Sequence, residues 1–186
     1  MPPEELMAFL HKVEKLKCNT RHSWTSTGRH ETVAAHSWRL ALMALLLREE
    51  IDGVDMEKVL RMCLLHDIGE AVTGDIPSFE KTEAHEQIEQ QAVASLLGTL
   101  PQPLSGELSA LFAEMDALAT PEARVYKALD KLEAVIQHNE APLDTWTPLE
   151  RELNRTYGTE EAQSAPFLAA LRALALEETD QKLQQS

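Results

Sequence analysis

A histidine and an aspartate lie side by side at positions 66 and 67, within the apolar run VLRMCLLHDIGEAVTGD. Neutral imidazole and carboxylate oxygen both suit divalent cations, and a buried carboxylate is unfavourable unless it is paired or coordinates a metal. His66 and Asp67 therefore predict a bound cation. Glu70 follows at the spacing of one helix face, so we expect its carboxylate near the cation, where it can accept a proton from water.

Two more residues of ligand type lie far from this pair in the sequence. His36 is in the apolar segment TVAAHSWRLALM, and Asp130 lies between Leu129 and Leu132. Taken singly, His36 is typical of a core histidine bonded to a backbone carbonyl, and DKLEA is typical of a surface ion-pair run. Helical bundles commonly build metal sites from facing helices, so we expect the four side chains to converge on one ion.

Helical periodicity dominates the sequence, and no run alternates as a strand would. We expect helices over 3–16, 33–50, 55–72, 82–98, 104–118 and 120–138, with weaker ones over 149–157 and 160–176. Asp55 and Thr120-Pro121 are strong helix starts. Residues 18–32 are expected to form a polar loop. The predicted fold is one all-α domain over 1–186, with its core at about 5–175 and a polar, fraying tail at about 177–186.

Composition narrows the possible partners. The chain has 186 residues, 44% of them hydrophobic, and a net charge of −14. This acidity disfavours a nucleic-acid polymer, but a small phosphate ester can still be held by a metal and local cations. The longest apolar stretch, LALMALLL, is too short to span a bilayer, so no membrane partner is expected. Two cysteines form no disulfide framework, which favours a cytoplasmic location.

The order His36, His66-Asp67, Asp130 resembles the H…HD…D signature of the HD-domain metal-dependent phosphohydrolases. The strings ETVAAHSWRLALMALLL, LLHDIGEAVTGDIPS and YKALDKLEAV resemble the branch that contains the 5′-deoxynucleotidases. The resemblance implies an HD-domain helical bundle, a homodimer, and hydrolysis of (deoxy)nucleoside 5′-monophosphates to nucleoside and phosphate. It also implies one divalent ion, Co, Mn, Mg, Zn, Ni or Fe, held by the four residues named above.

The resemblance further implies roles around the ion. Glu70 and Asp75 are the expected catalytic acids, and Asp75 also meets the sugar end of the substrate. Arg21 orients the phosphate, and Lys127 is a second substrate-binding cation. His22 is the remaining substrate-binding candidate, although the deoxynucleotidase has a tryptophan at this position.

A second departure from the family pattern is Ala35, where relatives usually carry an acid. Two other readings stay open: a non-catalytic HD-fold module that binds metal or nucleotide for regulation, and a phosphohydrolase that acts on another nucleotide phosphate. Arg21, Glu70 and Asp75 together favour catalysis. The short chain and its few basic groups disfavour a triphosphate pocket.

Overall fold

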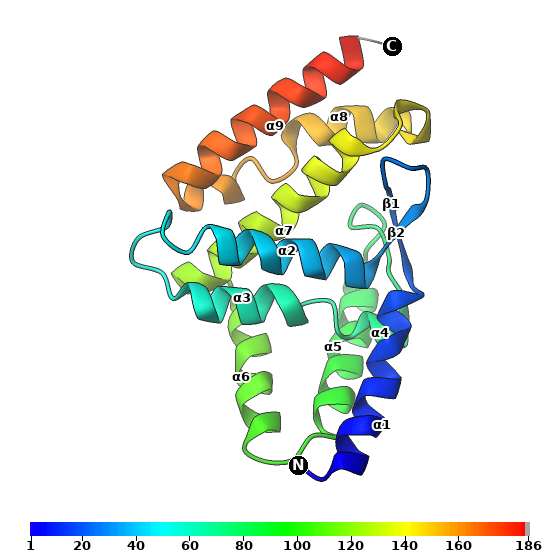
Figure 1. The fold of residues 1–186 in the computed structure, drawn as a ribbon, viewed down its shortest axis with the longest axis vertical. Helices are drawn as coiled ribbons and strands as arrows, with labels where there is room; N and C mark the ends of the chain where they lie inside the picture. Colours follow the sequence, from blue (N-terminus) through cyan, green and yellow to red (C-terminus); the bar gives the residue numbers. More distant parts are fainter. Residues whose placement is uncertain (185–186) are drawn as a thin grey trace.

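The computed structural model describes residues 1–184, and this part of the chain is mostly helical (Figure 1). The α-helices are α1 (Pro3–Val13), α2 (Val33–Leu46), α3 (Met56–Leu65), α4 (Glu70–Thr73), α5 (Glu83–Leu97), α6 (Leu104–Ala117), α7 (Pro121–Glu140), α8 (Pro148–Thr156) and α9 (Pro166–Gln184). Short 3-10 helices are η1 (Glu14–Lys17), η2 (Leu143–Thr145) and η3 (Glu161–Ser164). The predicted all-α class is confirmed.

A small hairpin lies where a loop was expected. β1 (Thr20–Trp24) pairs antiparallel with β2 (His30–Thr32), and Gly28 takes a positive φ of 76° in the turn between them. The expectation of no strand was wrong because both strands are too short and too polar to display a period of two. The hairpin leads directly into α2, where the Thr32 side chain accepts a hydrogen bond from the amide of Ala35.

The predicted third helix is interrupted at the metal-type pair. Asp55 caps its start as expected, but α3 ends at Leu65 and α4 begins only at Glu70. The intervening turn is closed by bonds between residues three apart, including Ile68 N to Leu65 O at 2.9 Å. Gly69, whose backbone angles are helical, lets this turn approach α5 closely, because a Cβ there would lie 2.8 Å from a methyl carbon of Val93. The close approach of α5 is a tertiary contact, which helical periodicity does not register.

The centre of the molecule is formed by α2, α3 and α7, which contact one another (Figure 1). Their fully buried side chains include Leu40, Val59, Met62, Leu129 and Leu132. A second apolar cluster joins the turn before α4 to α5 and α6. Apolar side chains thus fix the relative positions of the three elements that carry the predicted ligands.

Helix starts agree well with the sequence, whereas the two ends of the chain differ. The side chains of Thr82 and Thr120 cap α5 and α7. The first helix stops at Val13 and continues as η1. The predicted fraying tail is wrong for residues 177–184, which extend α9: the Thr179 side chain is fully buried, and its hydroxyl donates to Ala175 O at 2.9 Å. Residues 185–186 of that tail lie outside the described residues.

Within residues 1–184, no helix has the length and apolar character needed to cross a bilayer. The extent of the domain, residues 1–186, stays a prediction.

Candidate metal centre

His36 projects from the first turns of α2 into the centre of the fold, where it is fully buried. Its Nδ1–H donates to the carboxylate of Glu133 on α7. This bond fixes the tautomer and leaves the lone pair of Nε2 free to face the opposite side. Glu133 is fully buried as well, and its other oxygen accepts from Arg39 Nε at 2.6 Å.

His66 is oriented in the same way by a different acceptor. It lies at the carboxyl end of α3, and its Nδ1–H donates to the carbonyl of Cys63 at 2.9 Å. Its Nε2 then lies 3.2 Å from Nε2 of His36. Two unprotonated ring nitrogens at this distance repel each other unless a cation or a proton lies between them.

The two aspartates complete the cluster. Asp67 Oδ2 lies 3.0 Å from His66 Nε2 and 4.0 Å from His36 Nε2, and Asp130 Oδ1 lies 3.2 Å and 3.7 Å from His36 and His66 Nε2. Metal–ligand distances of about 2.1 Å place neighbouring ligands roughly 3.0 to 3.4 Å apart. His36, His66 and Asp67 each place a ligand atom within 4.8 Å of the other two, and Asp130 lies against both histidines, so the residues fit the implied metal.

The charges around the cluster favour a cation at its centre. Burial and Arg21 lower the pKa of His36, but Glu133 and Asp130 raise it more, to about 10. Burial raises the pKa of Asp130, yet Lys127 and His36 hold it well below its usual value. The site therefore stabilises a positive charge on the imidazole, and a divalent ion can take the place of that proton.

Glu70 begins α4 and turns a buried carboxyl group toward the same centre. One carboxylate oxygen from each of Glu70, Asp67 and Glu89 lies within 4.8 Å of the other two. Among the described residues, Glu70 Oε2 has no hydrogen-bond partner. Burial, Asp67 and Asp75 together raise the pKa of Glu70 to about 10. A buried, unpartnered oxygen of this kind is suited to holding water or a proton beside the ion.

Two cations lie against the aspartates. Arg21 of β1 directs Nη1 to Asp67 Oδ2 at 3.3 Å and Nε to Glu31 at 3.4 Å. Lys127, one turn before Asp130 on α7, places Nζ 2.8 Å from Asp130 Oδ2. Both cations are therefore held beside the predicted metal ligands.

His22 and Asp75 lie along the wall of a cavity of about 580 Å³ that also exposes Arg21, Glu70 and Lys127. Asp75 follows Gly74, whose φ of 77° turns the chain out of α4. Burial raises the pKa of Asp75, and Arg21 opposes that rise.

His22 makes a contact that the sequence did not predict. Its Nε2 lies 2.5 Å from Glu150 Oε1, and His138 Nε2 donates to the same oxygen at 2.8 Å. Burial raises the pKa of Glu150, but His138 and Thr147 lower it to about 2.

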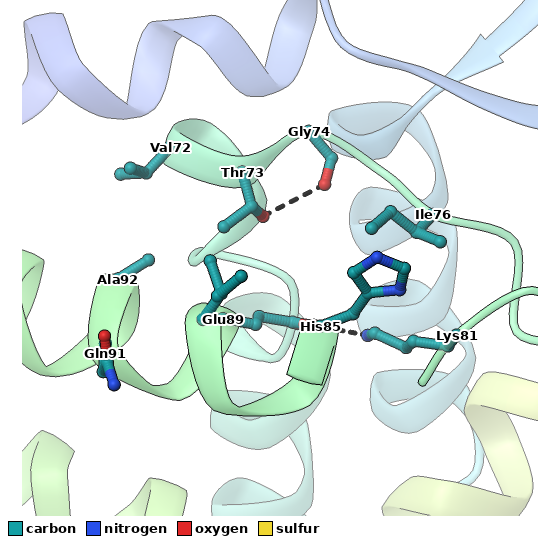
Figure 2. A pocket seen from close by; sticks show the side chains of 10 residues that line it. Val72, Thr73, Gly74, Ile76, Lys81, His85, Glu89, Gln91 and Ala92 are labelled. Carbon is teal, nitrogen blue, oxygen red and sulfur yellow. Dashed lines mark hydrogen bonds and ion pairs between the residues drawn. The ribbon is translucent and has the colours of Figure 1, made fainter. Parts of the chain in front are cut away.

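Two further cavities flank the centre. One of about 590 Å³ shares Asp67 and Lys127 with the cavity just described and extends between α5 and α6. The other, of about 440 Å³, lies over the outer side of α4 and α5 (Figure 2) and contains none of the four predicted ligands.

Sequence reasoning did not single out Glu133, Glu89, His138 or Glu150. For Glu133 a signal was present: it lies three residues after Asp130 and so shares its helix face, between Leu132 and Ala134. The string DKLEA fits a solvent-exposed run of ion pairs equally well. Only the burial of Glu133 in the structure distinguishes that interpretation from a residue that orients a ligand.

Replacing Glu133 with glutamine is expected to weaken metal binding about ten- to a hundredfold, because residues that orient a histidine ligand typically have effects of this size. Metal titration against a competing chelator measures it. Glu150→Gln is the matched control, since Glu150 is also buried and also accepts from histidine, but lies outside the cluster. Equal affinity in the Glu133 variant and the wild type would contradict the orienting role.

The fold and the site define a helical protein whose centre gathers two histidines and two aspartates, with acid and base groups beside them. The family model of the HD domain matches residues 13–172. Human 5′-deoxynucleotidase HDDC2 is 32% identical over 140 residues, which are 73% of this chain and 67% of that protein.

Solved structures of phosphohydrolases share the fold of this chain. A predicted metal-dependent phosphohydrolase from Magnetospirillum magnetotacticum superposes with a TM-score of 0.80 at 29% identity, over 96% of this chain and 93% of that one. The cyanophage S-2L HD phosphohydrolase DatZ, solved with dA and one catalytic Zn²⁺, shares the fold at 17% identity and a TM-score of 0.60, over 95% and 96% of the two chains. The chain belongs to the HD domain family, as its motifs predicted.

Proposed function

We propose that the protein is a metal-dependent 5′-deoxynucleotidase that hydrolyses (deoxy)nucleoside 5′-monophosphates to nucleoside and phosphate. The observation that carries this proposal is the convergence of His36, His66, Asp67 and Asp130 beside a cavity of about 580 Å³. That volume lies in the range typical of small-molecule sites, about 300–1,000 Å³. Similarity to curated 5′-deoxynucleotidases over most of the chain supports the substrate class.

The four ligands would hold one divalent ion, which supplies a Lewis acid for the phosphoryl group and lowers the pKa of water. Glu70 would accept the proton of the attacking water, because its carboxyl group lies beside Asp67 and the charge of a bound ion opposes the rise in its pKa. Arg21 and Lys127 compensate charge on the phosphoryl oxygens as the bond to the nucleoside breaks. Asp75 lies further along the cavity wall and contacts the sugar.

The charges around the cavities favour a monophosphate over a polyphosphate. Glu86, Glu89 and Asp116 line the second cavity, and Arg21 does not. Further phosphate groups directed there would meet these carboxylates and be repelled. This arrangement argues against the alternative of a triphosphate substrate.

Phosphate release from a panel of deoxy- and ribonucleoside monophosphates, each with Mn, Co, Mg and Zn, tests the proposal. We expect release from deoxynucleoside monophosphates with at least one of these ions, and its loss on chelation. A protein that binds metal but releases phosphate from no nucleotide would instead be the non-catalytic module. The same panel identifies the metal, which we propose among Co, Mn, Mg, Zn, Ni and Fe.

Two proposals concern the protein in its surroundings. We propose a cytoplasmic location, which the lack of a disulfide framework supports: Cys18 is exposed and Cys63 is buried, both as free thiols. We also propose a homodimer. Light scattering of the purified protein tests the second of these directly.

A further inference from the structure

Lys81 lies where the three cavities meet. It is in the irregular segment between α4 and α5, and it lines each of the cavities described above. Figure 2 shows its side chain reaching toward α5, where Nζ forms an ion pair with Glu89. The side chain is 27% exposed. Lys81 is therefore a cation within the site that the proposed mechanism has not used.

The surroundings of Lys81 are strongly acidic. Its partner Glu89 lies within 4.8 Å of the carboxylates of Asp67 and Glu70. Burial lowers the pKa of Lys81, but Glu89, and to a smaller extent Glu70 and Asp67, raise it overall. A phosphate that entered this region would face three carboxylates, and their repulsion requires compensation by nearby positive charge.

Arg21, Lys127 and Lys81 differ in the acidic residue that each one contacts. Arg21 and Lys127 contact Asp67 and Asp130, which are predicted metal ligands. Lys81 instead contacts Glu89, which belongs to no ligand set with His36 and His66. Moving Lys81 would thus leave the predicted ligands undisturbed. Its flexible four-carbon stem and rotatable ammonium group suit an exchange of partners.

We propose that Lys81 is a substrate-binding residue that exchanges Glu89 for the phosphate of the substrate. Together with Arg21 of β1 and Lys127 of α7, it surrounds the phosphate with cations from three separate elements. Glu89 is the competing acceptor that holds the ammonium group beside the site when no phosphate is bound. This inference rests on the proposed function, because it assumes a phosphate ester at the metal centre.

Binding of inorganic phosphate to the metal-loaded protein, measured by calorimetry, tests the proposal independently of turnover. Lys81→Met should weaken phosphate binding about ten- to a hundredfold, the value of a charge-assisted hydrogen bond, with metal content unchanged. Lys81→Arg should restore part of the affinity. KM for the nucleotide should rise in parallel with the phosphate dissociation constant.

Lys58→Met is the matched control. Lys58 is 29% exposed and is also paired with glutamates, Glu114 and Glu122, but it lines none of the three cavities. Its replacement should leave phosphate affinity within about twofold of the wild type. The same small effect in Lys81→Met would overturn the proposal.

Glu89→Gln provides a second, opposite test that holds even if Lys81→Met does not fold. Removing the competing acceptor should tighten phosphate binding severalfold, and unchanged or weaker binding would overturn the exchange. If the wild type binds phosphate but hydrolyses no nucleotide, the proposed function fails while these affinities still decide the role of Lys81.

Discussion

Replacing Asp67 with alanine is expected to remove both bound metal and phosphohydrolase activity. Asp67 Oδ2 lies 3.0 Å from His66 Nε2 and 3.3 Å from Arg21 Nη1, so the carboxylate links the predicted ligands to Arg21, the cation that we propose binds the phosphate. Its loss removes one negative charge and one ligand. We expect metal content to fall from about one ion per chain, the number that a single site implies, to nearly none. Activity should fall by more than the roughly hundredfold typical of residues that only orient ligands.

Elemental analysis after dialysis measures the metal, and phosphate release measures the activity. Asp116→Ala is the control, because Asp116 lines the adjacent cavity but is not a predicted ligand. It should retain metal. A thermal melt separates loss of metal from loss of the fold. Full metal content in a folded Asp67→Ala protein would show that the ligand assignment is wrong.

Replacing Glu70 with glutamine is expected to leave the metal bound and slow turnover about 10²- to 10⁴-fold, the range for loss of a general acid–base group. Glutamine keeps the shape of the side chain but cannot accept the proton from water. The backbone position should persist, since Asn19 Nδ2 still donates to the Glu70 carbonyl at 2.5 Å. The effect should appear in kcat, because Glu70 acts in the chemical step.

Glu86→Gln serves as the comparison for Glu70. Glu86 is an acid on α5 that lines both cavities at the centre, but it belongs to none of the carboxylate groups close enough to share an ion. We expect nearly wild-type kcat from it. A Glu70→Gln enzyme with equally normal kcat would remove Glu70 from the mechanism and leave the proton acceptor to be found elsewhere.

Secondary structure was predictable where the signal is local. The caps at Asp55, Thr82 and Thr120 mark their helix starts correctly, because a side-chain oxygen that accepts a backbone N–H acts within one turn. The break at residues 66–69 was not predictable in this way. The turn there packs Gly69 against Val93 of α5, which lies 24 residues later in the sequence.

Tertiary contacts also decide the structure of residues 177–184, where they order a segment that the sequence predicted to fray. EETDQKLQQS reads as solvated from composition, yet Asn139 of α7 accepts a hydrogen bond from Thr179, and its carbonyl accepts one from Lys182. The Thr179 hydroxyl has one hydrogen to share between Asn139 and Ala175, and its oxygen accepts from Asn154 Nδ2 at 3.0 Å. These partners hold the last turns of α9 in place. No local pattern in residues 177–184 encodes a partner that lies 40 residues earlier.

The types and order of His36, His66-Asp67 and Asp130 were enough, without coordinates, to predict the family and a divalent ion, because ligand chemistry belongs to each side chain. The packing of α2, α3 and α7 decided the rest. It brought an oxygen of Asp67 and one of Asp130 within 4.0 Å of the Nε2 atoms of His36 and His66, buried Glu133 behind His36, and placed Lys81 beside Glu89. Distance and burial set the strength of electrostatic interactions, and both arise only when segments far apart in the chain pack together.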